Sequence, residues 1–141
     1  MVGNAGILVT RVEYVKKTAS KRFIIVDAAM NDLIRPAFYD AYHEIVPLTR
    51  PIGVLVKSDV VGPICESGDY FCKDRLLPGV SEGDYLALLS AGAYGFVMAS
   101  NYNTRPLAAE ILVNGKRAAI ARERQPVGKI WSGEKIVAWL K

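Results

Sequence analysis

The densest group of reactive side chains in this sequence lies at residues 62–69, Gly-Pro-Ile-Cys-Glu-Ser-Gly-Asp. A thiol (Cys65), two carboxylates (Glu66 and Asp69) and a serine hydroxyl stand here between glycine and proline residues that favour tight turns. Such a loop could hold a carboxylate against the ammonium of a ligand, with a thiol within proton-transfer range. Judged by these side chains alone, a polar turn with one buried cysteine explains the segment equally well.

Arg35 and Tyr39 form a second candidate pair, because they are four positions apart in the sequence. On a helical turn, residues with this spacing share one face. The arginine fork bonds a carboxylate in a bidentate manner, so the pair suits recognition of a ligand carboxylate. A surface arginine stacked on a tyrosine is the simpler alternative, and the two residues by themselves favour it.

Two single aromatic residues complete the candidates. Tyr94 lies between Ala93 and Gly95, where small neighbours allow a ligand or another backbone segment to approach closely. A core or rim aromatic is the alternative for Tyr94. His43, the one histidine of the chain, has apolar and aromatic neighbours, and we expect it to be a packed, hydrogen-bonded structural residue rather than a catalytic base.

Composition and motifs exclude several classes of function. The sequence has no nucleophile elbow, no Walker A loop, no zinc-protease motif and no Gly-rich dinucleotide fingerprint. Cys65, Cys72 and His43 are too few for a metal site. The net charge is +4, but the basic residues come in small groups separated by acids, so we do not expect nucleic-acid binding. No apolar run is long enough to span a membrane, and the N-terminal residues have no basic region ahead of their apolar stretch, so we expect no secretory signal and a cytoplasmic location.

The hydrophobic pattern predicts a mainly β fold. Alternating or strongly apolar segments predict strands at 5–17, 22–27, 43–47, 52–57 and 85–90. Pro36 predicts the first turn of a short helix, and the mixed segment 59–74 is expected to be a long loop. Asn114-Gly115 predicts a type I′ turn between strands at 108–113 and 116–122. Many strands with one or two short helices indicate a β-barrel or sandwich that forms a single domain, residues 1–141.

Three segments resemble diaminopimelate decarboxylases. They are VDAAMNDLIRPAFY at 26–39, VVGPICESGD at 60–69 and AGAYGFVMASNYN at 91–103, in the order and approximate spacing of that family's C-terminal domain. The resemblance implies the β-barrel domain of a fold-type III pyridoxal-phosphate enzyme, whose other domain is an N-terminal α/β barrel. It further implies a cytoplasmic homodimer that converts meso-diaminopimelate into L-lysine and CO2 in lysine biosynthesis.

The resemblance also implies roles for the candidate residues. Those matching Arg35 and Tyr39 bind substrate. The residue matching Cys65 is the proposed donor of the proton that replaces the lost carboxyl group, and it is presented across a dimer interface. Glu66 contacts the distal end of the substrate, and a Glu rather than an Asp at this position favours diaminopimelate over ornithine or arginine. Tyr94 lies at both cofactor and substrate.

The cofactor half of such an active site is not found in this sequence. The family's Glu-Pro-Gly-Arg phosphate-binding motif and its Schiff-base lysine have no match here. The chain is therefore expected to be a C-terminal portion without its pyridoxal-phosphate barrel, from a split gene, a frameshift or a truncated gene, and inactive alone. Its expected partners are meso-diaminopimelate, a second copy of the chain and, if separately encoded, the N-terminal barrel. A non-catalytic β-barrel interaction or dimerisation module is the alternative.

Overall fold

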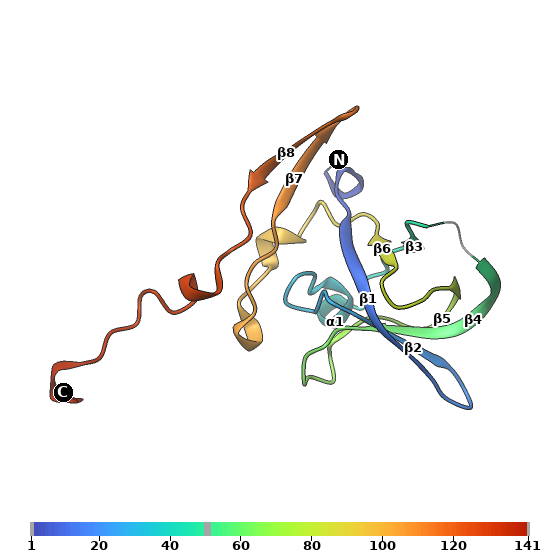
Figure 1. The fold of residues 1–141 in the computed structure, drawn as a ribbon, viewed down its shortest axis with the longest axis horizontal. Coiled ribbons are helices and arrows are strands. Elements are labelled where there is room, and N and C mark those ends of the chain that lie inside the picture. The colour runs from blue at the N-terminus through green and yellow to red at the C-terminus, as the bar shows by residue number, and fades with distance from the viewer. Residues whose placement is uncertain (1, 50–51, 141) are drawn as a thin grey trace. The chain divides into compact units, whose positions relative to one another are not determined.

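The structure, a computed structural model, describes residues 2–49 and 52–140 and contains two compact units, Met1–Ala99 and Ser100–Lys141 (Figure 1). The first unit is a six-stranded sheet, and the second contains a two-stranded hairpin. The six strands are β1 (Leu8–Lys17), β2 (Arg22–Val26), β3 (Ile45–Pro47), β4 (Ile52–Val61), β5 (Tyr70–Gly79) and β6 (Tyr85–Leu88). The prediction of a mainly β fold is confirmed.

The six-stranded sheet is curved into a nearly closed barrel. Its strand order is β3-β6-β1-β2-β4-β5, and its neighbours are antiparallel except for the parallel pair β2–β4. The two edge strands are β3 and β5, yet Ile45 of β3 and Leu77 of β5 line the same small apolar cavity, together with Ile24 of β2. Opposite edges of the sheet therefore approach one another around a common interior.

Strand alternation builds the barrel interior. In β2, residues 22, 24 and 26 are buried and the residues between them are only partly covered, as expected for the two-residue period of a strand with one face inward. The largest fully buried apolar side chains come from several strands and from the segment before the helix: Val12, Ile24, Val26, Leu33, Val60, Phe71 and Leu88. The core thus draws on segments that are far apart in the sequence.

The local predictions in this unit are largely confirmed. β1 and β2 form the expected antiparallel hairpin, and β3, β4 and β6 lie at the predicted strands. The helix α1 (Arg35–Tyr39) contains Pro36 in its first turn, where its missing N–H removes no helical hydrogen bond. The remaining helical turns in this unit are the 3-10 turns η1 (Gly3–Ala5) and η2 (Phe96–Met98).

The prediction of a long loop over 59–74 is wrong. β4 continues to Val61 and β5 begins at Tyr70, so the connection contains only residues 62–69. Polar residues inside these strands made them resemble a loop. Ser58 and Asp59 are buried in β4 because tertiary partners satisfy them, and the hydroxyl of Ser58 accepts a hydrogen bond from the buried Arg22 at 3.0 Å.

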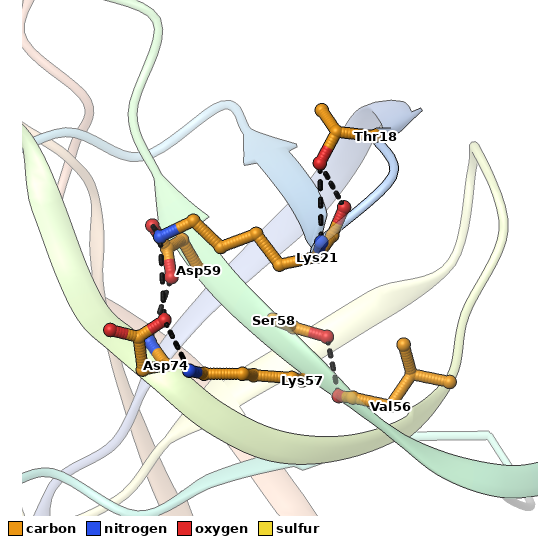
Figure 2. Close-up of polar contacts among 7 residues, drawn as sticks. All are labelled: Thr18, Lys21, Val56, Lys57, Ser58, Asp59 and Asp74. Carbon is orange, nitrogen blue, oxygen red and sulfur yellow. Dashed lines mark hydrogen bonds and ion pairs between the residues drawn. The ribbon is translucent and has the colours of Figure 1, made fainter.

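An ionic cluster shows how one of these polar residues is accommodated (Figure 2). The ammonium of Lys21, at the β1–β2 turn, lies 2.6 Å from Oδ2 of Asp59, and the backbone N–H of Asp74 donates to Oδ1 of Asp59 at 2.7 Å. Lys21 and Lys57 lie 3.4 and 3.3 Å from Oδ1 of Asp74. The cluster joins the β1–β2 turn to β4 and β5.

The second unit confirms the predicted hairpin but not its turn. β7 (Glu110–Asn114) pairs with β8 (Arg117–Arg122), and Asn114 lies opposite Arg117 as the last pair of the ladder. The two central residues of the turn are therefore Gly115 and Lys116, and of these only Gly115 has a positive φ, +60°. A positive φ at the first central position alone matches a type II′ turn, not the predicted type I′.

The rest of the second unit is irregular. Its 3-10 turns are η3 (Tyr102–Thr104), η4 (Val127–Lys129) and η5 (Ala138–Leu140). The side-chain oxygen of Gln125 accepts hydrogen bonds from Asn101 at 2.6 Å and from the backbone N–H of Leu107 at 3.0 Å, which joins the two ends of the segment that contains the hairpin. Over the described part of the chain, no helix has the length and apolarity required to cross a membrane.

Candidate functional site

The loop 62–69 presents Cys65 and Glu66 at the surface between β4 and β5. Both residues are exposed, and the loop is closed by hydrogen bonds from the N–H of Asp69 to the carbonyl of Glu66 at 3.0 Å and from the N–H of Gly68 to Oε1 of Glu66 at 3.0 Å. The alternative of a polar turn around a buried cysteine does not describe this loop, because its cysteine is exposed. The buried cysteine is Cys72, in β5, and burial raises the pKa of its thiol.

Asp69 has the most buried side chain of the loop 62–69. The sequence indicated it only as one of two carboxylates in a polar loop. It is 5% exposed. Oδ1 of Asp69 accepts a hydrogen bond from the backbone N–H of Met30 at 2.7 Å, and Oδ2 accepts one from the N–H of Ile64 at 2.9 Å. The carboxylate thus connects the loop 62–69, called the cysteine loop below, to the segment that leads into α1.

Arg35 and Tyr39 are the first and last residues of α1, so the predicted helical spacing is confirmed. Arg35 is partly buried and Tyr39 is exposed. The ring of Tyr39 packs edge-to-face against Phe38, with centroids 4.7 Å apart. The ring of Tyr39 thus packs on Phe38, whereas the alternative from the sequence had an arginine stacked on it.

Tyr94 is 64% exposed and has an unusual backbone conformation. Its φ is +57°, which is uncommon for a bulky residue and is found in native structures where the surroundings enforce it, often at functional sites. Nearby, a Cβ on Gly92 would collide with the carbonyl oxygen of Val2 and the amide nitrogen of Gly6. The small neighbours of Tyr94 therefore allow another backbone segment to come close. This contact between two backbone segments holds the loop that carries the tyrosine.

The three motifs meet at the segment before α1. Asp69 binds the N–H of Met30, and the Cα of Gly95 faces Leu33, whose Cδ1 would lie 3.8 Å from a Cβ at that glycine. The cysteine loop is therefore bonded to the segment before Arg35, and the loop that carries Tyr94 (the tyrosine loop, residues 91–95) lies beside the same segment.

Three of the described lysines have partners of their own. Lys21 and Lys57 belong to the ionic cluster with Asp59 and Asp74, and the ammonium of Lys73 lies 3.6 Å from the centroid of the Tyr70 ring. Among the residues that the structure describes, no three His, Cys, Asp or Glu side chains are grouped so as to hold a metal ion. The loop 62–69, α1 and Tyr94 thus offer a thiol, a carboxylate, a guanidinium and two phenols.

Comparison with known proteins gives a consistent result. A sequence profile of the family described as "Pyridoxal-dependent decarboxylase, C-terminal sheet domain" matches residues 2–92. The chain is 48% identical to the diaminopimelate decarboxylase of Zymomonas mobilis over 99% of this chain and 33% of that protein, and 54% identical to that of Aquifex aeolicus over 89% of this chain and 30% of that protein. The crystal structure of Helicobacter pylori diaminopimelate decarboxylase complexed with L-lysine superposes with a TM-score of 0.86 at 44% identity, covering 93% of this chain and 32% of that one. The chain spans about one third of the length of the curated relatives it matches.

Proposed function

The chain belongs to the pyridoxal-dependent decarboxylase family through its C-terminal sheet domain, and from this premise we propose that it forms the substrate-facing part of a diaminopimelate decarboxylase. The reaction is the loss of CO2 from meso-diaminopimelate to give L-lysine. The observation that carries the proposal is the convergence of the cysteine loop, the tyrosine loop and the entry to α1, because these are the three segments with family motifs. The L-lysine bound by the Helicobacter pylori relative is the product that this reaction would leave.

Substrate recognition belongs to α1 and the cysteine loop. meso-Diaminopimelate has two carboxylates and two ammonium groups, so an enzyme that acts at one end requires a cation and an anion for the other. Arg35 provides the cation, and its planar fork matches a carboxylate. Glu66 provides the anion, and its hydrogen bond from the N–H of Gly68 holds the carboxylate in the loop. Tyr39, at the opposite end of α1 from Arg35, adds a phenol on the same helix.

Proton donation belongs to Cys65. Pyridoxal phosphate, when bound, supplies the electron sink that allows the α-carbon to release CO2. The hydrogen on Sγ of Cys65 then moves to the α-carbon in place of the lost carboxyl group, which is general acid catalysis by a thiol. The exposure of Cys65 fits this role, because a thiol buried in the barrel, like that of Cys72, would not reach a substrate.

The residues of the site fit one side of the cofactor. Tyr94, exposed and held at a positive φ, can cover bound pyridoxal phosphate and substrate. Lys21, Lys57 and Lys73 are held by carboxylates or by an aromatic ring. We therefore place the lysine that binds the cofactor in an N-terminal α/β barrel, and residues 1–141 in the C-terminal β domain. A homodimer, in which the cysteine loop of one subunit reaches the cofactor of the other, completes the site.

Reconstitution tests this proposal. The chain is combined with an N-terminal barrel segment from one of its relatives, and release of CO2 from meso-diaminopimelate is measured for the chain, the segment and the mixture. Activity is expected only in the mixture. Cys65→Ala should lower kcat in the mixture by about 10²-fold or more, the contribution typical of a general acid. Cys72→Ala is the matched control and should leave kcat close to that of the unaltered chain.

Two results would contradict the proposal. Full activity of the Cys65→Ala mixture would remove the proton-donor role. Release of CO2 by the chain alone, together with a visible absorbance band that borohydride fixes to one of its own lysines, would show that the cofactor binds here without a partner.

An interaction module without catalysis is the second candidate. The observation that favours it lies in the hairpin of the second unit, where both strands expose large apolar side chains: Ile111, Leu112, Val113 and Ile120. Exposed apolar groups of this kind are typical of surfaces that bind another protein. In the reconstitution, stable association of the two parts without release of CO2 would favour this candidate.

A further inference from the structure

The carboxylate of Asp69 connects two segments of the chain. Asp69 is 5% exposed, and its carboxylate accepts backbone hydrogen bonds from two separate segments, at Met30 and at Ile64. Ile64 directly precedes Cys65, whereas Met30 lies on the segment that leads to Arg35. One side chain therefore joins the cysteine loop to the segment that precedes α1.

Gly62 makes room for this carboxylate. A Cβ at position 62 would collide with both carboxylate oxygens of Asp69, and the N–H of Gly62 donates to the backbone carbonyl of Asp69 at 3.1 Å. Gly62 does not have a positive φ, so the position requires glycine for its missing side chain rather than for its conformational freedom. The space beside Asp69 is thus shaped for an aspartate that points inward.

We propose that Asp69 is a positioning residue, whose carboxylate holds the cysteine loop on the segment before α1 and so sets the location of Cys65. Backbone N–H groups bound to a carboxylate form hydrogen bonds about twice as strong as those between neutral groups. In a buried site their loss leaves donors unpaired, which is unfavourable. The roles of Cys65 and Arg35 rest on the proposed function, whereas the contacts that connect their segments do not.

Positioning of the thiol by Asp69 predicts a specific effect on kcat and KM. If Asp69 places the thiol, its loss displaces the proton donor while Arg35 still binds substrate. A displacement of about 1 Å can lower a rate by about 10²-fold. In the reconstituted enzyme, Asp69→Asn is therefore expected to lower kcat by about 10²-fold with a much smaller change in KM. A merely structural role would lower the amount of folded protein and leave kcat per folded site unchanged.

Amide hydrogen exchange tests the positioning contacts without any activity. In the full chain, Asp69→Asn replaces one acceptor oxygen by an NH2 group, and Gly62→Ala displaces the same carboxylate without changing its charge. Because asparagine keeps one acceptor oxygen, Asp69→Asn should make at least one of the amides of Met30 and Ile64 exchange about 10-fold faster or more, and Gly62→Ala should do so for both, while the amides of β2 and β4 keep their protection. Because both variants disturb the same carboxylate contacts, the double variant should exchange no faster than the faster single one.

A matched control separates this effect from a general response to losing a carboxylate. Oδ2 of Asp84 accepts the backbone N–H of Ser81 at 2.7 Å in the turn before β6, so Asp84→Asn makes the same chemical change at another site. It should leave the exchange of Met30 and Ile64 unaltered. In every variant the buried Cys72 should stay unreactive toward a thiol reagent, which reports that the barrel is folded.

Unchanged exchange at Met30 and Ile64 in folded Asp69→Asn, or additive effects in the double variant, would overturn the proposal. So would an Asp69→Asn enzyme with normal kcat. If Asp69→Asn fails to fold, Gly62→Ala decides the question by the same measurements. An unaltered mixture that releases no CO2 would instead overturn the proposed function, and the exchange result would still stand.

Discussion

Nδ1 of His43 lies 2.8 Å from the carbonyl oxygen of Leu89, and this hydrogen bond ties the segment before β3 to the end of β6. The imidazole is 0% exposed. A carbonyl oxygen only accepts hydrogen bonds, so Nδ1 must carry the proton. Nε2 has no hydrogen-bond partner among the described residues. The prediction of a packed, hydrogen-bonded histidine is confirmed.

His43 should therefore matter for stability through both its volume and its Nδ1 proton. His43→Ala removes the ring and the hydrogen bond, and we expect the free energy of unfolding to fall by about 3 kcal/mol. His43→Asn retains an N–H donor near the position of Nδ1 and should be less destabilising. Urea denaturation of the three proteins measures this, and equal losses for Ala and Asn would show that the bond to Leu89 contributes nothing.

Asp59 should be the essential member of the ionic cluster. Its side chain is buried and binds both Lys21 and the N–H of Asp74, so Asp59→Asn leaves the ammonium facing an NH2 group. We expect a loss of about 1–3 kcal/mol in the free energy of unfolding. Asp74→Asn is the matched control, because Asp74 is exposed and Asn tolerates its φ of +52°. A loss for Asp74→Asn as large as that for Asp59→Asn would contradict this ranking.

Alkaline pH should destabilise the fold through Cys72. Burial raises the pKa of its thiol above the ordinary value of 9.0, so the folded protein keeps the proton at a pH where the unfolded chain releases it. Stability contributed by Cys72 is thus complete below pH 9.0 and decreases as the pH rises through the folded pKa. The slope can reach about 1.4 kcal/mol per pH unit for one proton.

Urea denaturation under reducing conditions between pH 8 and 10 measures the slope. Cys72→Val should lack it, whereas Cys65→Ala should retain it. The hydrogen bond to Asp59 raises the pKa of Lys21 above its ordinary 10.5, so the contribution of Lys21 is lost only at higher pH and does not interfere. A slope that persists in Cys72→Val would assign the alkaline loss to another group.

Gly92 should hold the tyrosine loop to the N-terminal segment. Its N–H donates to the carbonyl of Gly3 at 3.0 Å, and an added Cβ would collide with backbone atoms of Val2 and Gly6. Gly92→Ala is expected to destabilise the first unit by about 1–3 kcal/mol, as overpacking does. Gly133→Ala, in the second unit and with open space around it, is the control and should have little effect. Thermal unfolding followed by circular dichroism compares the two.

The candidate site was predictable from the sequence in its parts but not in its assembly. Cys65, Glu66, Arg35, Tyr39 and Tyr94 were all identified by residue type, by spacing and by resemblance to a family. Asp69 was included only as one of two carboxylates in a polar loop. Its carboxylate accepts a hydrogen bond from the N–H of Met30, and no local pattern around either residue indicates that the two meet.

Features that depend on near neighbours were determined by the sequence itself: the β1–β2 hairpin, the helix beginning around Pro36 and the composition of the loop 62–69. Turn residues, proline geometry and strand alternation act within a few positions, so they can be recognised without the fold. Only the tertiary structure decided that Asp59 belongs to a strand, that Cys65 is exposed whereas Cys72 is buried, and that Asp69 joins two motifs. Whether a polar side chain is buried or a cysteine is exposed depends on residues many positions away in the sequence. These residues come together only when the barrel closes.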